Sequence, residues 1–252
     1  MFKNRRSFKI ATLGAVVAGS LLVSTAAQAY LLPASYLVGL LVEKRREQKI
    51  QDLSIELRTE REGTTATVDE RLYLKSPSRM RRVEEGDGGR VIIEKGAKTA
   101  TGTEGKLALQ GGSVSTLLAT LLAPSTSKDS SESTRIIGVL QSLGVDTKVV
   151  ALGRLDGRPA YIIGARIWEG NKPQVWLDKE TILPVRWIFP VKERDGASNL
   201  RDVRLLEYGS ALAGHWFPRV IEVYHGTQLV EHTEVADLKR NQSLPETLFT
   251  LP

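Results

Sequence analysis

The sequence predicts a mainly β fold: an incomplete, half-open β-barrel of about eleven antiparallel strands, covered on its apolar face by short α-helices. Short segments in which apolar and polar residues alternate recur along most of the chain. Turn sequences rich in Gly, Asp and Asn separate these segments at regular intervals. Three other segments follow the helical period, one at the front of the chain and two in its middle.

The first group of strands follows an N-terminal helix. Leu53, Ile55 and Leu57 alternate with polar side chains, and Leu72 and Leu74 repeat the pattern further on. The sequence Glu-Gly-Asp-Gly-Gly that ends at residue 89 is typical of a turn. We therefore expect an antiparallel meander. Its predicted strands are 51–59, 65–75, 80–85 and 90–95.

The three helical segments are short and amphipathic. Ser133 suits the N-cap of the last helix, after a polar loop over 125–133, and Gly144 suits the position after its end. The basic run Lys44-Arg45-Arg46 is expected to form a solvated helix face or end. The predicted helices lie within 30–49, 114–123 and 134–143, and their apolar faces include Leu37, Leu40, Leu41, Leu117, Leu121, Ile137 and Leu140.

Strands return after the last helix and continue to the C-terminus. The predicted strands are 148–152, 159–168, 174–178, 184–189, 200–208, 217–225 and 229–239. Side chains two residues apart on a strand share a face, provided that no bulge intervenes. This parity places Ile163, Ile167, Val175, Leu177, Val185, Trp187 and Phe189 on one face of the sheet, which we assign to the interior.

The first 29 residues have the layout of a secretory signal peptide. Four basic residues precede an apolar stretch that is too short to span a membrane, and Ala27-Gln28-Ala29 forms a cleavage site. We expect cleavage after Ala29, a periplasmic location and one domain over residues 30–252. The whole chain has a net charge of +6, but removing the four basic residues leaves +2, which argues against a nucleic-acid partner.

No arrangement of residues predicts an enzyme or a bound cofactor. The chain has no cysteine, and the spacing of His215, His225 and His232 fits no compact metal motif. The sequence contains no nucleophile elbow and no phosphate-binding glycine loop. We therefore predict no catalytic residue, no metal and no cofactor.

A curved sheet under a loosely fitted helical cover encloses an apolar cavity that suits acyl chains. A chain of about 14 carbons would contribute on the order of 10 kcal/mol before entropy losses, at ~0.8 kcal/mol per buried CH₂. The predicted cavity residues are Leu53, Ile55, Leu57, Leu72, Leu74, Ile163, Ile167, Val175, Leu177, Trp187 and Phe189. The predicted lid residues are Leu37, Leu40, Leu41, Leu117, Leu121, Ile137 and Leu140.

Several segments resemble the outer-membrane lipoprotein-sorting (LolA/LolB-like) family. They are Arg71-Leu-Tyr-Leu-Lys-Ser-Pro77 with Arg79-Met-Arg81, Val175 to Arg186, Trp216 to Ile221, Asp237 to Asn241 and Leu244 to Phe249. The resemblance implies an eleven-stranded half-barrel that carries lipid acyl groups from an inner-membrane transporter to an outer-membrane receptor. It also implies a lid-locking arginine before the first proline, where this chain has Ser76; Arg79 or Arg81 would then take that role.

The sequence is therefore compatible with two classes of function. The first is a monomeric periplasmic carrier that binds the acyl chains of a lipoprotein or lipid. The alternative is a periplasmic regulatory or sensor module on the same fold, which binds a protein partner, as periplasmic sensors that bind an anti-sigma factor do. A hydrolase is the least favoured class, because no motif supports it.

Overall fold

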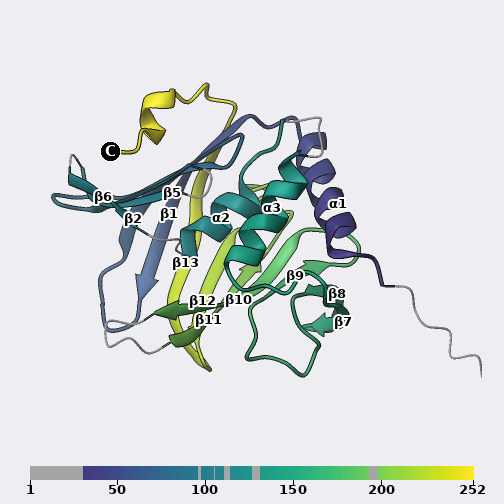
Figure 1. Cartoon of the computed structure of the whole chain (residues 1–252). Coiled ribbons are helices and arrows are strands. Elements are labelled where there is room, and N and C mark those ends of the chain that lie inside the picture. The colour runs from purple at the N-terminus through teal and green to yellow at the C-terminus, as the bar shows by residue number, and fades with distance from the viewer. Residues whose placement is uncertain (1–30, 96–97, 105, 111–113, 127–130, 193–197) are drawn as a thin grey trace, which may run out of the picture. The chain divides into compact units, whose positions relative to one another are not determined.

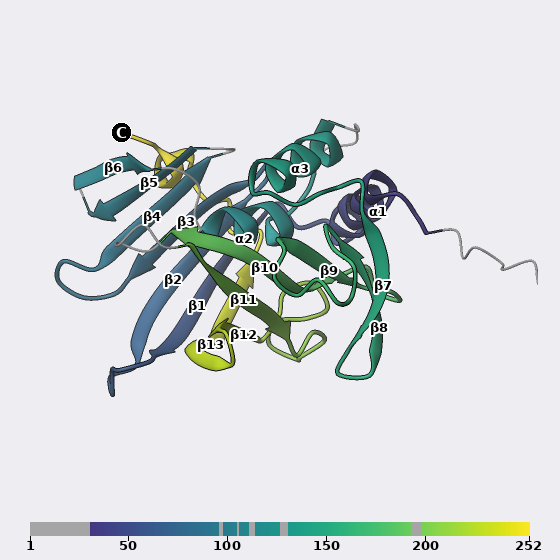
Figure 2. The same cartoon turned by 60° about the horizontal axis from the view of Figure 1, so that its bottom comes forward.

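The described residues form a single antiparallel sheet of thirteen strands that curves around a group of short helices (Figures 1 and 2). The computed structural model describes residues 31–95, 98–104, 106–110, 114–126, 131–192 and 198–252. The predicted signal peptide with its cleavage site after Ala29, and a turn expected at Asp195-Gly196, lie outside these residues. Residues 31–252 form one structural unit.

Two meanders make up the sheet. The first contains β1 (Asp52–Arg61), β2 (Val68–Lys75), β3 (Arg79–Glu84), β4 (Arg90–Lys95), β5 (Lys98–Thr103) and β6 (Lys106–Gln110). The second contains β7 (Val150–Leu155), β8 (Arg158–Ile163), β9 (Gln174–Asp178), β10 (Pro184–Lys192), β11 (Ser198–Leu206), β12 (Val220–His225) and β13 (Gln228–Arg240). Antiparallel pairing of β1 with β13 joins them, so the spatial order runs from β6 through β1 and β13 to β7.

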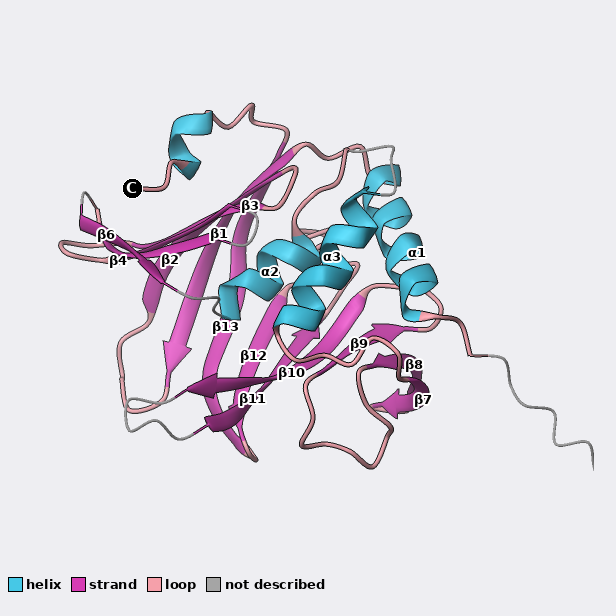
Figure 3. Cartoon of the chain, viewed as in Figure 1, coloured by secondary structure: helices cyan, strands magenta, loops and turns pink. Residues whose placement is uncertain are grey.

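Three α-helices lie against the concave face of the sheet (Figure 3). They are α1 (Ala34–Glu47), α2 (Val114–Leu122) and α3 (Ser131–Ser142). Helix α2 lies between the two arms of the curved sheet, and α3 lies beside it, next to α1. Among residues 31–126 and 131–252, apart from the short gaps within these ranges, no helix is long and apolar enough to cross a membrane.

The expected fold class is confirmed, and some element boundaries differ. The described residues form thirteen strands instead of about eleven, and the two that were not predicted are β5 and β6. Strand β5 has the sequence Lys-Thr-Ala-Thr-Gly-Thr, which lacks apolar alternation. Helix α3 begins at Ser131, so Ser133 lies inside the helix rather than at its N-cap. Gly144 does follow the helix, with a positive φ of 83°.

The strand expected over 159–168 ends early, at Ile163. Gly164 turns the backbone there with a φ of 109°, and a Cβ at this position would lie 2.6 Å from the carbonyl oxygen of Pro173. The residues that follow belong to a turn, so Ile167 does not continue the inward face of the strand.

A bulge breaks the predicted parity of β10. The register with β9 shifts between Pro184 and Arg186. This shift turns Val185 toward a small separate cluster with Ile162 and Trp176, away from the main core. The prediction that Val185 shares the inward face is therefore wrong, because parity holds only where no bulge intervenes.

The C-terminal segment covers part of the first meander. A short 3₁₀ helix, η1 (Glu246–Phe249), packs against β3 and β4, and Phe249 is fully buried. Arg79 pairs with Glu246, and Nη1 of Arg81 donates to the carbonyl oxygen of Leu248 at 3.4 Å. These contacts attach the end of the chain to the sheet.

An ion-pair network crosses the centre of the sheet. The guanidinium of Arg61 on β1 lies 2.6 Å from Glu70 on β2 and 2.9 Å from Glu84 on β3. Arg82 on β3 pairs with Glu70 and, at 3.2 Å, with Glu231 on β13. Burial alone would raise the pKa of Glu231, but Arg82 and Arg61 outweigh it and hold that pKa below its ordinary value. The network therefore links four neighbouring strands by charge.

We predict that Glu231→Gln lowers the free energy of unfolding by about 1–3 kcal/mol at neutral pH, near the range for hydrogen bonds to charged groups. A carboxyl whose pKa is lowered on folding stabilises the fold above its unfolded pKa of about 4.3 and loses that contribution as pH falls. The difference between wild type and variant should therefore shrink below about pH 5.

Urea unfolding at a series of pH values measures this difference. Glu60→Gln on β1 is the control, because it removes the same charge from an exposed position. If the difference in the free energy of unfolding between wild type and Glu231→Gln stayed constant below pH 5, the role given to the carboxylate would be contradicted.

Candidate functional site

The concave face of the sheet and the inner faces of the three helices form one continuous apolar core. Fourteen of the predicted cavity and lid residues lie in it, each at most 4% exposed. They are Leu37, Leu41, Leu53, Ile55, Leu57, Leu72, Leu74, Leu121, Leu140, Ile163, Val175, Leu177, Trp187 and Phe189. Strand alternation and helical periodicity thus located the interior of the molecule.

The remaining predicted residues lie at the edge of this core or outside it. Leu40 and Ile137 are partly buried and pack against the core. Ile167 is 52% exposed, so the prediction that it lines the interior is wrong; its strand ends before it. Leu117 belongs to α2, and its side chain lies outside the described part of the chain.

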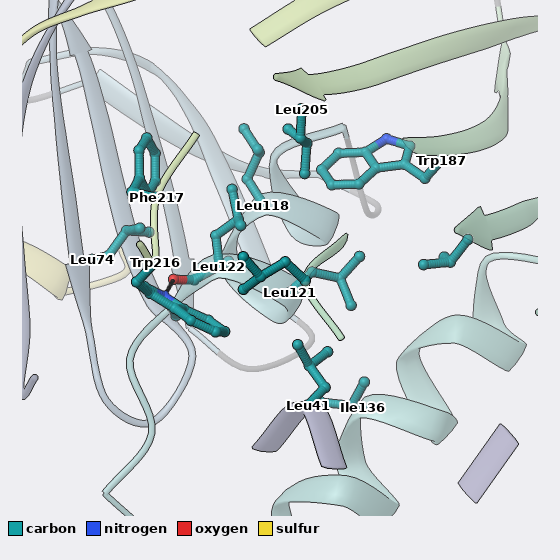
Figure 4. Close-up of a cluster of buried hydrophobic side chains, with 14 of the residues drawn as sticks. Leu41, Leu74, Leu118, Leu121, Leu122, Ile136, Trp187, Leu205, Trp216 and Phe217 are labelled. Carbon is teal, nitrogen blue, oxygen red and sulfur yellow. Dashed lines mark hydrogen bonds between the residues drawn. The ribbon is translucent and has the colours of Figure 1, made fainter. Parts of the chain in front are cut away.

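Helix α2 fills the concavity in this conformation. Leu118, Leu121 and Leu122 are at most 4% exposed, and Figure 4 shows Leu118 between Phe217 and Trp187. These side chains occupy part of the space between the helices and the sheet. An acyl chain bound at the same place would have to displace them.

One polar atom inside this core lacks a partner. The indole of Trp187 is fully buried, and its Nε1–H group has no hydrogen-bond acceptor among the described residues. A buried donor without an acceptor costs about 1–3 kcal/mol. A ligand that brings a carbonyl oxygen to the concave face would recover part of that free energy.

A buried arginine joins the three helices. Arg45 on α1 is 1% exposed, and its Nη1 donates to the carbonyl oxygen of Thr120 on α2 at 3.0 Å. The same nitrogen lies 3.7 Å from Oε1 of Glu132 in the first turn of α3. The guanidinium also lies over the ring of Trp216, 5.9 Å from its centroid. We call this set of contacts the Arg45 junction.

Further hydrogen bonds fix the residues around the junction. Nε1 of Trp216 donates to the carbonyl oxygen of Leu122 at 3.2 Å, the bond drawn in Figure 4. The hydroxyl of Ser125, just after α2, donates to Oε2 of Glu132. Both bonds attach the C-terminal end of α2 to its neighbours, so the polar contacts described for this helix gather at one end.

In the described part of the chain, the junction contains two positive groups and one negative group. Arg135 on α3 lies 3.9 Å from Oε1 of Glu132, so two guanidinium groups flank one carboxylate. Burial lowers the pKa of Arg45 to about 10; Glu132 raises it and Arg135 lowers it further. Burial likewise lowers the pKa of Arg135. Arg45 still keeps its proton at neutral pH, and holding this charge out of water costs free energy.

Ser76 also contacts the helical cover. Its hydroxyl lies 3.0 Å from that of Thr126 and accepts a hydrogen bond from the backbone N–H of Thr126 at 3.2 Å. Arg79 donates to the carbonyl oxygen of Ser76 and pairs with Glu246, and Arg81 donates to Leu248, so among the described residues neither arginine contacts a helix of the cover. Arg45 and the Ser76–Thr126 pair connect the cover to its surroundings.

A cavity of about 320 Å³ adjoins the junction near the end of α1. Its lining includes Lys44, Tyr208 and Trp216. Burial raises the pKa of Tyr208 well above its ordinary value, and the phenol donates to the carbonyl oxygen of Pro184 at 2.7 Å. Because Trp216 both lines this cavity and contacts Arg45, the cavity reaches the junction.

The sequence reasoning missed the Arg45 junction, although part of the information was present. Arg45 follows Val38 and Leu41 at helical spacing, so continuing the apolar stripe of α1 by one turn places it on the buried face. Glu132 lies in a Ser-rich tract, whose composition is typical of a loop. The two residues are far apart in sequence, and no local pattern indicates such a pair.

Solved structures share this arrangement of sheet and helices. A LolA superfamily protein from Nitrosomonas europaea matches with a TM-score of 0.52 and 14% identity, over 88% of this chain and 99% of that chain. A putative outer membrane lipoprotein-sorting protein domain from Vibrio parahaemolyticus matches with a TM-score of 0.50 and 13% identity, over 86% and 97% of the two chains. A DUF1329 family protein from Desulfovibrio piger matches with a TM-score of 0.50 and 14% identity, over 87% and 98%.

The fold is therefore LolA-like: one open antiparallel sheet covered by three short helices. The resemblance that the sequence motifs predicted is confirmed at the level of structure over most of the chain. No family model and no curated protein sequence matches the chain. At 13–14% identity, the likeness establishes the fold alone.

We predict that Arg45→Gln loosens the helical cover more than the sheet. The change removes the charge-assisted hydrogen bond to Thr120 and leaves Arg135 as the cation beside buried Glu132. The free energy of unfolding should fall by up to about 3 kcal/mol, the low end for a broken buried pair. Amide hydrogen exchange should accelerate in α1 and α3 and change little in β1 and β13.

Arg46→Gln is the matched control, because Arg46 is the next residue on α1 and its side chain is 40% exposed. Uniform acceleration across helices and strands in Arg45→Gln would show that the arginine supports the whole fold and has no specific role at the cover.

Proposed function

We propose that the chain is a periplasmic carrier, without enzymatic activity, that binds the acyl chains of a lipoprotein or lipid on the concave face of its sheet. The observation that carries this proposal is the continuous apolar face under helices that a few polar contacts hold in place. In the closed form the helices fill the interior, and in the loaded form acyl chains take their place.

The free energy of this exchange is the difference between two terms, the apolar area exposed when α2 moves and the apolar area that the acyl chain covers. Moving α2 outward exposes side chains such as Leu118 and Leu121, and an entering acyl chain covers the sheet residues that α2 leaves. Both terms scale with apolar area at about 25 cal/mol per Å², so the gain offsets the loss to the extent that the two areas match. A close match would suit a carrier, because cargo that outcompeted the helices by a large margin would not be released.

The proposed transport route between the inner and the outer membrane is based on the fold resemblance. The chain would be exported by its N-terminal segment, act as a monomer, receive cargo from an inner-membrane transporter and deliver it to an outer-membrane receptor. The unsatisfied N–H of Trp187 supports a ligand that has an ester or amide carbonyl next to its acyl chains.

A disulfide that fixes the helical cover tests the proposal. The chain has no cysteine, so two introduced cysteines form one defined bond. Replacing Ser76 and Thr126, whose hydroxyls are 3.0 Å apart, attaches the segment after α2 to the sheet. We predict that the oxidised form binds a fluorescent long-chain fatty acid at least about tenfold more weakly than the reduced form, because closure then opposes binding.

The control is a second pair with the same separation. The hydroxyls of Thr59 and Thr233 are also 3.0 Å apart, but they join β1 to β13 within the sheet. Oxidation of this pair leaves the helical cover free to move, so it should weaken fatty-acid binding much less than oxidation of the Ser76–Thr126 pair. If the Ser76–Thr126 bond had no effect, binding would not involve opening of the cover; if the unmodified protein bound no acyl ligand, the carrier proposal would be wrong.

A second function has one observation in its favour. Ile167 and Trp168 are 52% and 73% exposed on a turn braced by Glu169, which pairs with Lys172 at 2.7 Å. Exposed apolar side chains on a braced turn suit contact with a protein, as a regulatory or sensor module requires. Recovery of one stoichiometric partner that Trp168→Ala abolishes, together with lipid-free protein, would favour this function over transport.

A further inference from the structure

Among the described residues, the Arg45 junction contains more positive than negative charge and more hydrogen-bond donors than acceptors. Nε and Nη2 of Arg45 have no acceptor in the described part of the chain, and neither do Nε, Nη1 and Nη2 of Arg135. One oxygen of Glu132 accepts from Ser125, and the other accepts no hydrogen bond from a described residue. Guanidinium donors thus surround a carboxylate that neutralises only one of the two charges.

The two arginines of the junction lie next to the apolar interior. Ile136, one position after Arg135, is fully buried and faces Leu41 of α1, one turn before Arg45 (Figure 4). The side chain of Arg135 is 27% exposed, but its guanidinium nitrogens are buried, as is the whole side chain of Arg45. A ligand with acyl chains between helices and sheet would therefore place its polar end beside these two arginines.

We infer that the junction recognises the anionic head group of an acylated ligand, a phosphodiester or similar monoanion, through Arg45 and Arg135. This inference rests on the proposed carrier function. When the helices part, the head group supplies the second negative charge that the two guanidinium groups lack, and guanidinium forks bind such oxygens in pairs. The charge of the ligand and the opening of the cover are thereby linked.

Two soluble lipids with the same chains measure this recognition. Dioctanoyl phosphatidylglycerol has a net negative charge, and dioctanoyl phosphatidylcholine has no net charge. In calorimetric titration of the wild-type protein, the anionic lipid should bind roughly tenfold more tightly or better, the effect of a hydrogen bond to a charged group. Inorganic phosphate, which has the charge without the chains, should bind far more weakly than the anionic lipid.

Arg135→Gln is the decisive variant. It removes the surplus charge and leaves the bond from Arg45 to Thr120, so the closed cover and the fold should persist. Its affinities for the two lipids should become equal within about twofold. Arg154→Gln is the control, because Arg154 lies on edge strand β7 and donates within its own hairpin, to the carbonyl oxygen of Gly157; this variant should keep the preference.

Each result has a distinct meaning. Equal affinity of the wild type for both lipids overturns the head-group inference and leaves the carrier proposal standing. A preference that survives in Arg135→Gln also overturns it. Phosphate that binds as tightly as the anionic lipid would assign the site to a free anion and reject the lipid head group. Failure of both lipids to bind the wild type would reject the carrier function itself.

Discussion

The apolar concave face of the sheet governs the rest of the structure, because so large an apolar surface cannot remain in water. Side chains such as Ile55 and Leu72 are fully buried only because a second layer lies over them, and the three short helices form that layer. Burial of this face holds the helices down, and the same force would draw in any hydrocarbon that reaches it. The stability of the fold and the proposed affinity for acyl chains would then have one physical origin.

The polar contacts at the helix ends decide how the layer is held. A well-packed apolar residue in place of Arg45 would often give an equally stable or more stable junction, because the guanidinium must leave water to sit there. An arginine instead gives a junction with a defined geometry, made of a carbonyl oxygen, a carboxylate and an indole ring. In the proposed open form these groups would regain hydration, which would lower the free-energy cost of opening.

The sequence was most informative where a pattern is local. Alternation over residues such as Leu53 and Ile55 follows directly from the geometry of a strand with one buried face, so the interior was largely predictable. Val185 and Ile167 were misplaced because a bulge and a glycine turn interrupt the alternation that parity assumes. The Arg45 junction was not predictable in full, since its partners come from three helices whose packing no short pattern describes.

The order of the strands also determines when the protein can complete its core. Each meander can form from neighbouring segments, but β1 meets its partner β13 only after nearly the whole chain is present. Loop closure over such a distance is slow compared with the pairing of adjacent strands. The two central strands are thus the first and the last of the sheet, so an incomplete chain lacks the contact that unites its halves. Assembly of the interior is thereby deferred until the final strand arrives.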